Sequence, residues 1–208
     1  MDTTFDLSIQ ISDFTIISKA RKALLLLIAN ALSADVISDK AVQLLFICTH
    51  NSRRSQLAEV LTDLLARHYG LDVHAFSGGT EVTAFAPEMI QAINAFGIHI
   101  EAEDESDNPK YLVTELGEKT YFSKVYDEQG NPSAGFYALM LCNEADKACP
   151  EIQGALHRFP LKYTDPKFAD DTAEVTDVYK AKVLEVGTEL NFLFHMLNKL
   201  RLNSTNRV

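Results

Sequence analysis

The feature that most constrains how this chain can fold is an apolar run ending at a cysteine, VQLLFIC over residues 42–48. Its first six residues have the length and composition of a buried strand. A polar stretch follows at residues 49–53, and apolar side chains then recur at helical spacing from Ser55 onward. We therefore predict a strand, a loop and a helix in succession, with Cys48 where the strand opens into the loop.

This placement has chemical consequences for Cys48. A loop that leads into a helix N-terminus directs backbone N–H groups and the positive end of the helix dipole at its contents. Such a loop binds anions, and the same field, together with Arg54, favours a nucleophilic thiolate at Cys48. Arg54 can grip two oxygens of a tetrahedral oxyanion with its planar fork, and Ser55 can hydrogen-bond the sulfur. The predicted oxyanion loop consists of Thr49, His50, Asn51, Ser52 and Arg53.

A cysteine, five residues, an arginine and a serine form the motif of cysteine-dependent phosphatases, and with it the chain resembles the low-molecular-weight protein-tyrosine-phosphatase family. The alternative is a buried structural cysteine, because Cys and Arg at this spacing also occur in unrelated proteins. The strand before the motif and the helix after it favour the phosphatase-like interpretation. Strands alternate with helices along the chain, which predicts an α/β fold with a parallel sheet between helices. The resemblance spans about residues 42–200 and implies three layers and four strands.

Two segments differ from the resembled family. Residues 1–40 precede the motif strand and are predicted as a helical N-terminal extension to a phosphatase or arsenate reductase-like domain at residues 41–208. Within the extension, residues 19–32 are predicted as an apolar helix, buried against the body or against another subunit. Residues 120–141 are predicted to contain an inserted β-hairpin, with strands at residues 121–126 and 135–141.

The apolar stretch also raises the alternative of a signal peptide, because basic residues precede it and residues 29–31 resemble a cleavage site. Its long leader with acidic residues is wrong for a signal peptide, and the stretch is too short to span a bilayer. Three widely spaced cysteines do not resemble a secreted disulfide framework. We therefore expect a cytoplasmic protein that does not insert into a membrane.

The charge balance limits the kinds of partner. The chain has 19 basic and 29 acidic residues, a net charge of −10, and no basic run, so we expect no binding to nucleic acid. A focused pocket in an acidic molecule suits a small oxyanion such as arsenate or phosphate, or a phosphoester, better than a large polyanion. We predict no metal site and no cofactor.

Asp165, followed by Pro166, is the predicted general acid and base. Transfer of a phosphoryl group to a thiolate needs a proton for the leaving group, and the same carboxyl group can later activate water. The resembled family carries an Asp-Pro pair in a late loop over the nucleophile, whereas the alternative is an ordinary turn. For an aromatic phosphoester, Phe168 and Tyr163 are predicted as walls of the site.

Cys142 and Cys149 distinguish two branches of the family. With Cys48 they resemble the three working cysteines of thioredoxin-coupled arsenate reductases. That resemblance implies that Cys48 attacks arsenate, Cys142 attacks the adduct to release arsenite, and Cys149 forms the final disulfide with Cys142, which thioredoxin reduces. In a continuous helix the two Cα atoms would lie about 10 Å apart, beyond the roughly 7 Å limit for a disulfide. The segment must therefore unwind to oxidise. The alternatives are buried structural thiols or a zinc site with His157.

In some reductases a monovalent cation lies beside the loop, and the residues here that correspond to its ligands are Asn51, Glu59, Ser77 and Asp107. Two positions depart from the family pattern: His50 replaces a glycine, and Arg53 replaces a cysteine. We predict an arsenate reductase, with a tyrosine or small-phosphoester phosphatase as the alternative. A non-catalytic oxyanion-binding protein, a homodimer through the N-terminal extension, is the third hypothesis.

Overall fold

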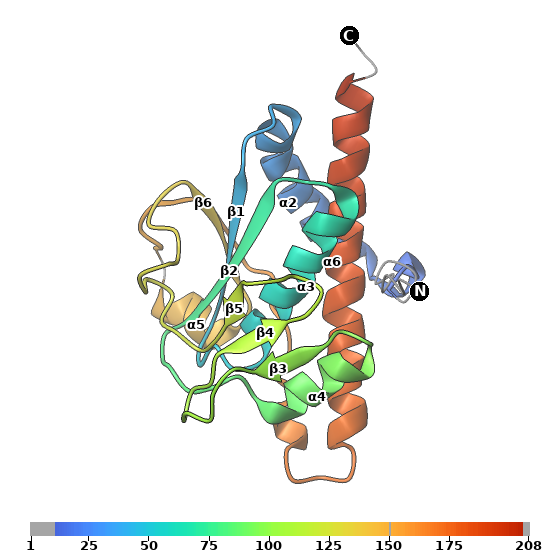
Figure 1. The fold of residues 1–208 in the computed structure, drawn as a ribbon. Helices are drawn as coiled ribbons and strands as arrows, with labels where there is room; N and C mark the ends of the chain where they lie inside the picture. The colour runs from blue at the N-terminus through green and yellow to red at the C-terminus, as the bar shows by residue number, and fades with distance from the viewer. Residues whose placement is uncertain (1–10, 150, 206–208) are drawn as a thin grey trace.

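The computed structural model describes residues 11–149 and 151–205, so residues 1–10 of the predicted extension and the break predicted at Pro150 lie outside it. Its centre is a sheet of four parallel strands in the order β2-β1-β6-β7 (Figure 1). The strands are β1 (Val42–Cys48), β2 (Val73–Gly79), β6 (Phe136–Met140) and β7 (Ala155–Phe159). The predicted parallel sheet between helices is confirmed.

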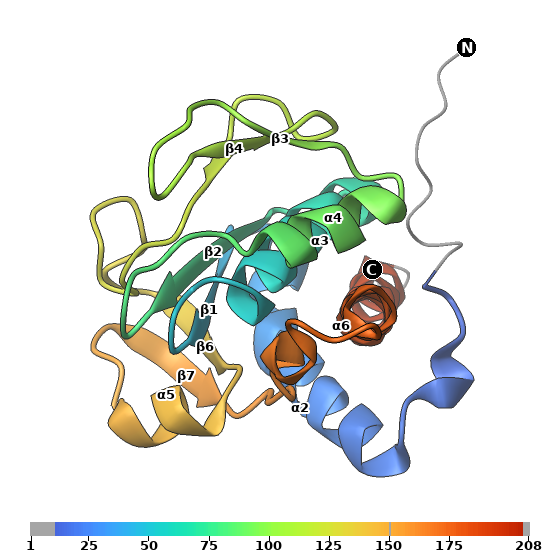
Figure 2. The same cartoon turned by 90° about the horizontal axis from the view of Figure 1, so that it is seen from below.

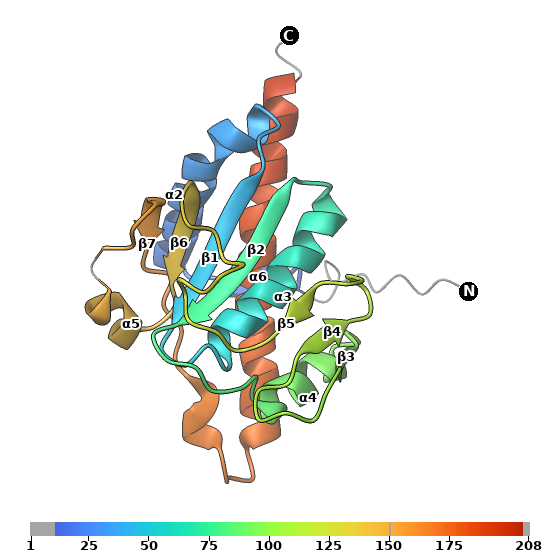
Figure 3. The ribbon, with the colours of Figure 1, turned by 60° about the vertical axis from the view of Figure 1, so that its left-hand side comes forward.

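Three helices cover one face of this sheet: α2 (Lys19–Ile37), α3 (Arg54–Tyr69) and α6 (Val175–Thr205) (Figure 3). The last of them extends beyond both ends of the sheet, and α2 packs along it. α2 begins at Ser18, whose hydroxyl accepts the Arg21 N–H at 3.2 Å, and it continues five residues past the predicted end. Its buried residues form a stripe with the spacing of one helix face, while Leu27 is exposed; the stripe consists of Leu25, Ile28, Ala29, Leu32 and Val36.

The hairpin predicted within residues 120–141 is wrong. Its first half is β5 (Thr120–Tyr121), which pairs with β4 (Tyr111–Val113), and its second half is β6, which pairs in parallel with β1. All five residues of β6 are buried, as expected for an inner strand of a parallel sheet covered on both faces. A turn around Gly130 lies within the connection between β5 and β6. This connection passes beside the end of β2 before it reaches β6.

A second sheet of three antiparallel strands consists of β3 (Ile100–Ala102), β4 and β5. It lies beside α4 (Pro87–Ala95), which begins with a proline, a residue favoured in the first turn of a helix (Figure 2). The acidic segment at residues 101–109 contains the end of β3 and the turn to β4. Of the described helices, none combines the length and apolar character that a membrane span requires.

The carboxyl ends of the parallel strands meet at one edge of the sheet, the usual place for a ligand in an open α/β sheet. Cys48 ends β1 beside Gly79 of β2, and Leu141, just after β6, donates its N–H to the Ile47 carbonyl at 2.8 Å. A Cβ at Gly79 would lie 2.6 Å from the Thr49 carbonyl oxygen. Glycine is therefore needed where β2 passes the loop that follows Cys48.

Candidate active site

The oxyanion loop folds around the Cys48 sulfur. The Asn51 N–H donates to Cys48 Sγ at 3.2 Å, and Ser55 Oγ lies 3.0 Å from the same atom. Asn51 has φ +47°, a left-handed conformation that asparagine adopts more readily than most residues. This conformation turns the loop so that the Asn51 N–H faces the sulfur, and such a contact stabilises a thiolate.

The side chain of Asn51 determines the direction of a hydrogen-bond chain behind the loop. Its Oδ1 accepts the backbone N–H of Lys124 at 2.8 Å, so its Nδ2 must face the two serines. Nδ2 then donates to Ser55 Oγ and to Ser77 Oγ, each at 2.8 Å. Because Ser55 Oγ accepts from Asn51, its own hydrogen is available for the Cys48 sulfur.

A buried carboxylate ends this chain. Glu59 Oε2 accepts from Ser77 Oγ at 2.6 Å, and Glu59 Oε1 lies 3.0 Å from Lys119 Nζ. Burial lowers the pKa of Lys119 and the charge of Glu59 opposes this, so that the pKa lies above its ordinary value. Burial lowers the pKa of Lys124, whose Nζ lies 3.9 Å from Glu59. Asn51, Ser77 and Glu59, three of the four residues that correspond to cation ligands, are thus joined by hydrogen bonds. The Lys119 ammonium group already contacts Glu59, and Asp107, the fourth residue, is exposed.

Arg54 lies at the N-terminus of α3 with only 7% of its side chain exposed. Its Nη1 donates to the Tyr163 carbonyl at 3.0 Å, and its Nη2 donates to Asp165 Oδ2 at 2.5 Å. Among the described residues, no acceptor lies within hydrogen-bonding distance of its buried Nε. Buried donors are rarely left unpaired, so this group is suited to an oxyanion in the loop.

The Arg53 side chain pairs with residues that lie outside the oxyanion loop and far along the chain. Its Nε donates to Tyr179 OH at 2.9 Å, and its Nη2 lies 3.3 Å from Asp170 Oδ2. Its Nη1 is 3.9 Å from Asp165 Oδ1. Asp165 precedes the short helix η2 (Pro166–Ala169), and Tyr179 belongs to α6, so Arg53 links the loop to the segment that carries the predicted acid. Nothing in the sequence pairs Arg53 with these partners, which lie more than 110 residues later.

A cavity of about 490 Å³ opens over the loop and brings several predicted residues together. His50 is 40% exposed at its rim, 3.5 Å from Glu81. The prediction that Phe168 forms an aromatic wall is wrong, because this side chain is 70% exposed and outside the cavity lining, whereas the largely buried Tyr163 does belong to the lining. The lining residues are Thr49, His50, Arg54, Asn143, Glu144, Lys162, Tyr163, Thr164 and Asp165.

Cys142 lies against the oxyanion loop. Its Sγ is 3.3 Å from Thr49 Oγ1 and accepts the Ala145 N–H at 3.3 Å at the start of α5 (Asn143–Ala148). The parallel pairing of β6 with β1 produces this contact, because both strands end at the same level. Cys149 lies at the other end of α5, and all three cysteines are free and buried.

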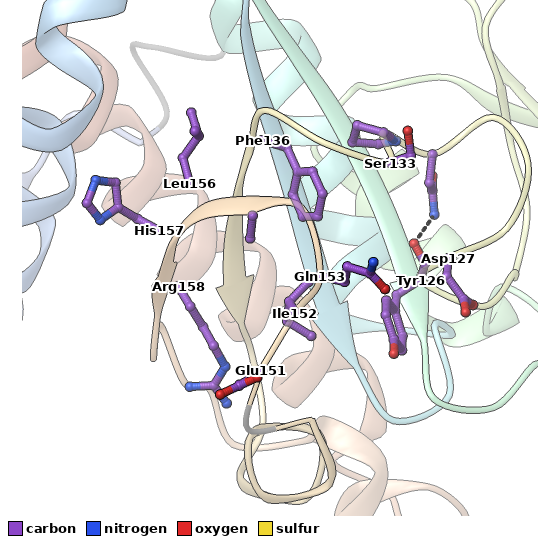
Figure 4. Close-up of a pocket in the computed structure, with 13 residues that line it drawn as sticks. Tyr126, Asp127, Ser133, Phe136, Glu151, Ile152, Gln153, Leu156, His157 and Arg158 are labelled. Atoms are coloured by element: carbon purple, nitrogen blue, oxygen red, sulfur yellow. Dashed lines mark hydrogen bonds between the residues drawn. The ribbon is translucent and has the colours of Figure 1, made fainter.

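A larger groove of about 1040 Å³ lies between the β5–β6 connection and β7 (Figure 4). No residue of the oxyanion loop lines this groove, so the larger of the two cavities is not the one that opens over this loop. Tyr126 is on its wall, where burial, then Cys149 and Asp127, raise the pKa of the phenol. His157 also lines it and stacks on the rings of Tyr137 and Phe159 at 5.8 and 5.9 Å. Within the described part of the chain, no three His, Cys, Asp or Glu residues form a group suited to a metal ion.

Comparison with known proteins gives matches that agree with this geometry. Residues 43–115 match the family model "Low molecular weight phosphotyrosine protein phosphatase". An arsenate reductase of Shouchella clausii is 29% identical over 130 residues, covering 62% of this chain and 77% of the relative. Arsenate reductase 2 of Staphylococcus epidermidis is 28% identical over 121 residues, covering 58% and 76%.

Solved structures share the fold at low identity. A YwlE arginine phosphatase mutant with a phosphorylated active-site serine superposes with a TM-score of 0.52 at 17% identity, over 76% of this chain and 97% of that one. A low-molecular-weight protein tyrosine phosphatase from Bacillus subtilis gives 0.50 at 17% identity, over 76% and 98%. The family match, the curated relatives and the fold agree. Over residues 43–115 the chain is therefore similar to the low-molecular-weight phosphotyrosine protein phosphatase family, and the comparisons support a cysteine-based, phosphatase-like enzyme.

Proposed function

We propose that this chain reduces arsenate to arsenite through a relay of Cys48, Cys142 and Cys149, with thioredoxin as the reductant. The observation that carries the proposal is the contact of Cys142 Sγ with Thr49 Oγ1 at 3.3 Å. A second thiol beside the oxyanion loop has no part in phosphoester hydrolysis, whereas the relay requires one. The two curated arsenate reductases support the same activity.

The first step of the proposed reaction uses the oxyanion loop. The Cys48 thiolate attacks arsenic, and one arsenate oxygen leaves as water after protonation by Asp165, which lines the cavity and contacts Arg54. Arg54 and the loop N–H groups hold the remaining oxygens. This step changes no oxidation state, because the arsenic atom exchanges an oxygen ligand for sulfur.

The next two steps reduce the arsenic atom and regenerate the Cys48 thiolate. The Cys142 thiolate attacks Cys48 Sγ, the electron pair of the S–As bond passes to arsenic, and arsenite leaves. Cys149 then attacks Cys142 Sγ and releases the Cys48 thiolate, which leaves a Cys142–Cys149 disulfide. A thioredoxin dithiol reduces this disulfide and is itself oxidised. Two thiols have thus supplied the two electrons that reduce As(V) to As(III).

Phosphatase activity is the second candidate, and the position of Asp165 favours it. This carboxylate reaches the cavity and contacts Arg54, which places a proton donor near the leaving group of a bound phosphoester. Hydrolysis would need Cys48, Arg54 and Asp165, but neither Cys142 nor Cys149.

Serine variants of the second and third cysteines separate the two functions. We expect Cys142→Ser and Cys149→Ser each to abolish arsenate-dependent NADPH consumption with thioredoxin and its reductase. Hydrolysis of p-nitrophenyl phosphate by the same preparations should stay within about twofold of the parent protein, since neither thiol contacts the ester. Arsenate turnover that survives both substitutions would contradict the relay, and a parent protein that hydrolyses the ester without reducing arsenate would establish the phosphatase.

The relay requires α5 to open, and its contacts show what opposes this. Only Ala145 is buried within the helix. Asp146 pairs with Arg158 at 2.5 Å and with Lys162 at 2.6 Å, and Arg158 also donates to the Cys149 carbonyl at 3.2 Å. The hydrogen bond from Lys162 lowers the pKa of Asp146 although burial opposes this, so the carboxylate is charged at neutral pH. Partly exposed ion pairs, rather than core packing, therefore keep α5 closed.

Removing the charge of Asp146 should make the disulfide form faster. We expect Asp146→Asn to raise the rate of Cys142–Cys149 oxidation by diamide about two- to fivefold, because exposed ion pairs contribute up to about 1 kcal/mol. The rate is measured by quenching with a thiol alkylating reagent and mass spectrometry. Glu144→Gln is the matched control, since no described residue forms an ion pair with this carboxylate of the same helix. Equal rates in both variants would show that Asp146 does not hold α5 closed.

A further inference from the structure

Arg21, a partly buried cation of α2, links this helix to α6 and to the segment that carries Asp165. Its Nε lies 2.8 Å from Glu189 Oε2 of α6, and the two side chains are 18% and 10% exposed. The guanidinium carbon also lies 4.5 Å from the centroid of the Tyr163 ring, within cation–π range. The sequence predicted only an apolar packing role for this helix, and an ion pair 168 residues apart has no sequence signal.

Tyr163 connects this cluster to the oxyanion site. Its ring is buried, whereas its carbonyl oxygen accepts from Arg54 Nη1 at 3.0 Å and its N–H donates to the Leu141 carbonyl at 3.0 Å. Asp165 follows two residues later. Tyr163 therefore occupies the point where the segment after β7 is attached to the core, directly before it enters the cavity.

Replacing Arg21 with an uncharged residue should change the position of the Tyr163 ring, because charged groups lie on both sides of the contact. Burial raises the pKa of the Tyr163 phenol well above its ordinary value, and the Glu189 carboxylate raises it further while Arg21 opposes this. Without the guanidinium, the carboxylate would remain buried beside the aromatic ring, and no other described residue forms an ion pair with it. An uncompensated buried charge is strongly unfavourable, so the ring or the carboxylate must move.

We infer that Arg21 is a positioning residue of the active site. By its contact with the Tyr163 ring it fixes the position of the Tyr163 carbonyl oxygen, which accepts a hydrogen bond from Arg54. α2 is thereby part of the catalytic scaffold rather than only an added helix. The inference rests on the proposed binding of an oxyanion by Arg54, because its consequence is measured there. A shift of the Tyr163 backbone turns the guanidinium fork away from the loop, and a bidentate contact is sensitive to such a turn.

Phosphate protection of Cys48 against iodoacetamide tests this directly in the full chain. The alkylated Cys48 peptide is quantified by mass spectrometry at increasing inorganic phosphate, which gives the half-protecting concentration. Unfolded molecules react without protection, so a loss of folded protein lowers the protected amplitude and leaves that concentration unchanged. The measurement therefore separates positioning from stability and needs no turnover.

We expect Arg21→Met to raise the half-protecting phosphate concentration about tenfold, the effect of weakening one hydrogen bond to a charged group. Arg21→Lys should raise it about threefold, because an ammonium can pair with Glu189 but cannot lie flat on the ring. Lys19→Met, an exposed charge on the same helix, should leave it unchanged. Leu25→Ala, which removes core packing of α2, should reduce the protected amplitude alone.

A double variant tests whether Arg21 acts through Arg54. In an Arg54→Lys background, Arg21→Met should have no further effect on the half-protecting concentration, because the two residues act through one contact. A concentration within twofold of the parent value in Arg21→Met, or a change confined to amplitude, overturns the inference and leaves the proposed function standing. A parent protein in which phosphate gives no protection overturns both.

Discussion

Replacing Cys48 with serine is expected to lower arsenate reduction and p-nitrophenyl phosphate hydrolysis about 10⁴-fold or more, since removing a catalytic nucleophile has effects of this size. The structure explains why serine cannot substitute. The Asn51 N–H and Ser55 Oγ contact the sulfur at 3.2 and 3.0 Å and would stabilise a thiolate, but neither of these two groups is a base that could deprotonate a serine hydroxyl. Initial rates of both reactions, normalised to folded protein, give the measurement.

The binding of oxyanion in this variant serves as the control. Phosphate should still bind Cys48→Ser, because Arg54 and the loop N–H groups are unchanged, and this can be followed by ³¹P line broadening. Residual turnover above about 1% of the parent rate would show that another residue is the nucleophile, since such a substitution removes far more than this. An active parent with an inactive variant would also reject the hypothesis of a non-catalytic oxyanion-binding protein.

Arg54→Lys is expected to lower kcat/KM about 10²- to 10³-fold, the effect of losing one preorganised donor to developing charge. Arg54 makes two contacts that a lysine cannot reproduce together, to the Tyr163 carbonyl and to Asp165, while its Nε remains available for an oxyanion. A lysine provides one ammonium in place of the planar fork. The kinetics with p-nitrophenyl phosphate or arsenate should show a fall in kcat and weaker competition by phosphate.

Arg53→Lys is the matched control for this variant, since it makes the same substitution at the adjacent position. The Arg53 guanidinium is held by Tyr179 and Asp170, so its replacement should act only through the position of Asp165. We expect a loss of about tenfold, typical of a weakened hydrogen bond to a charged group. Equal losses at both positions would contradict the assignment of Arg54 as the oxyanion ligand.

Most of the oxyanion site could be predicted because its residues are contiguous. Cys48, the loop and Arg54 lie within seven residues, and the alternation of strand, loop and helix is visible in the apolar spacing. Local backbone geometry then brings the N–H groups to the sulfur, as the Asn51 contact shows. The orientation of Arg53 could not be predicted in this way, because two adjacent arginines carry the same local signal and only distant partners distinguish them.

The predicted hairpin failed for a related reason. Residues 121–126 and 135–141 are two apolar runs around a turn, which is the pattern of a hairpin. β6 is nonetheless buried on both faces, and such a strand carries no alternation that reports its neighbours. Pairing with β1 buries it more completely than a partly exposed hairpin would, and tertiary burial therefore overrode the local pattern.

By itself, the sequence determined the resemblance to a phosphatase family and the succession of strand, loop and helix around Cys48, because these depend on neighbours along the chain. Only the tertiary structure decided that Cys142 meets Thr49 across 93 residues, that Lys119 contacts Glu59, and that Arg21 of α2 lies on Tyr163. Such contacts form when the sheet and helices pack, and each joins side chains whose local sequence carries no record of the other.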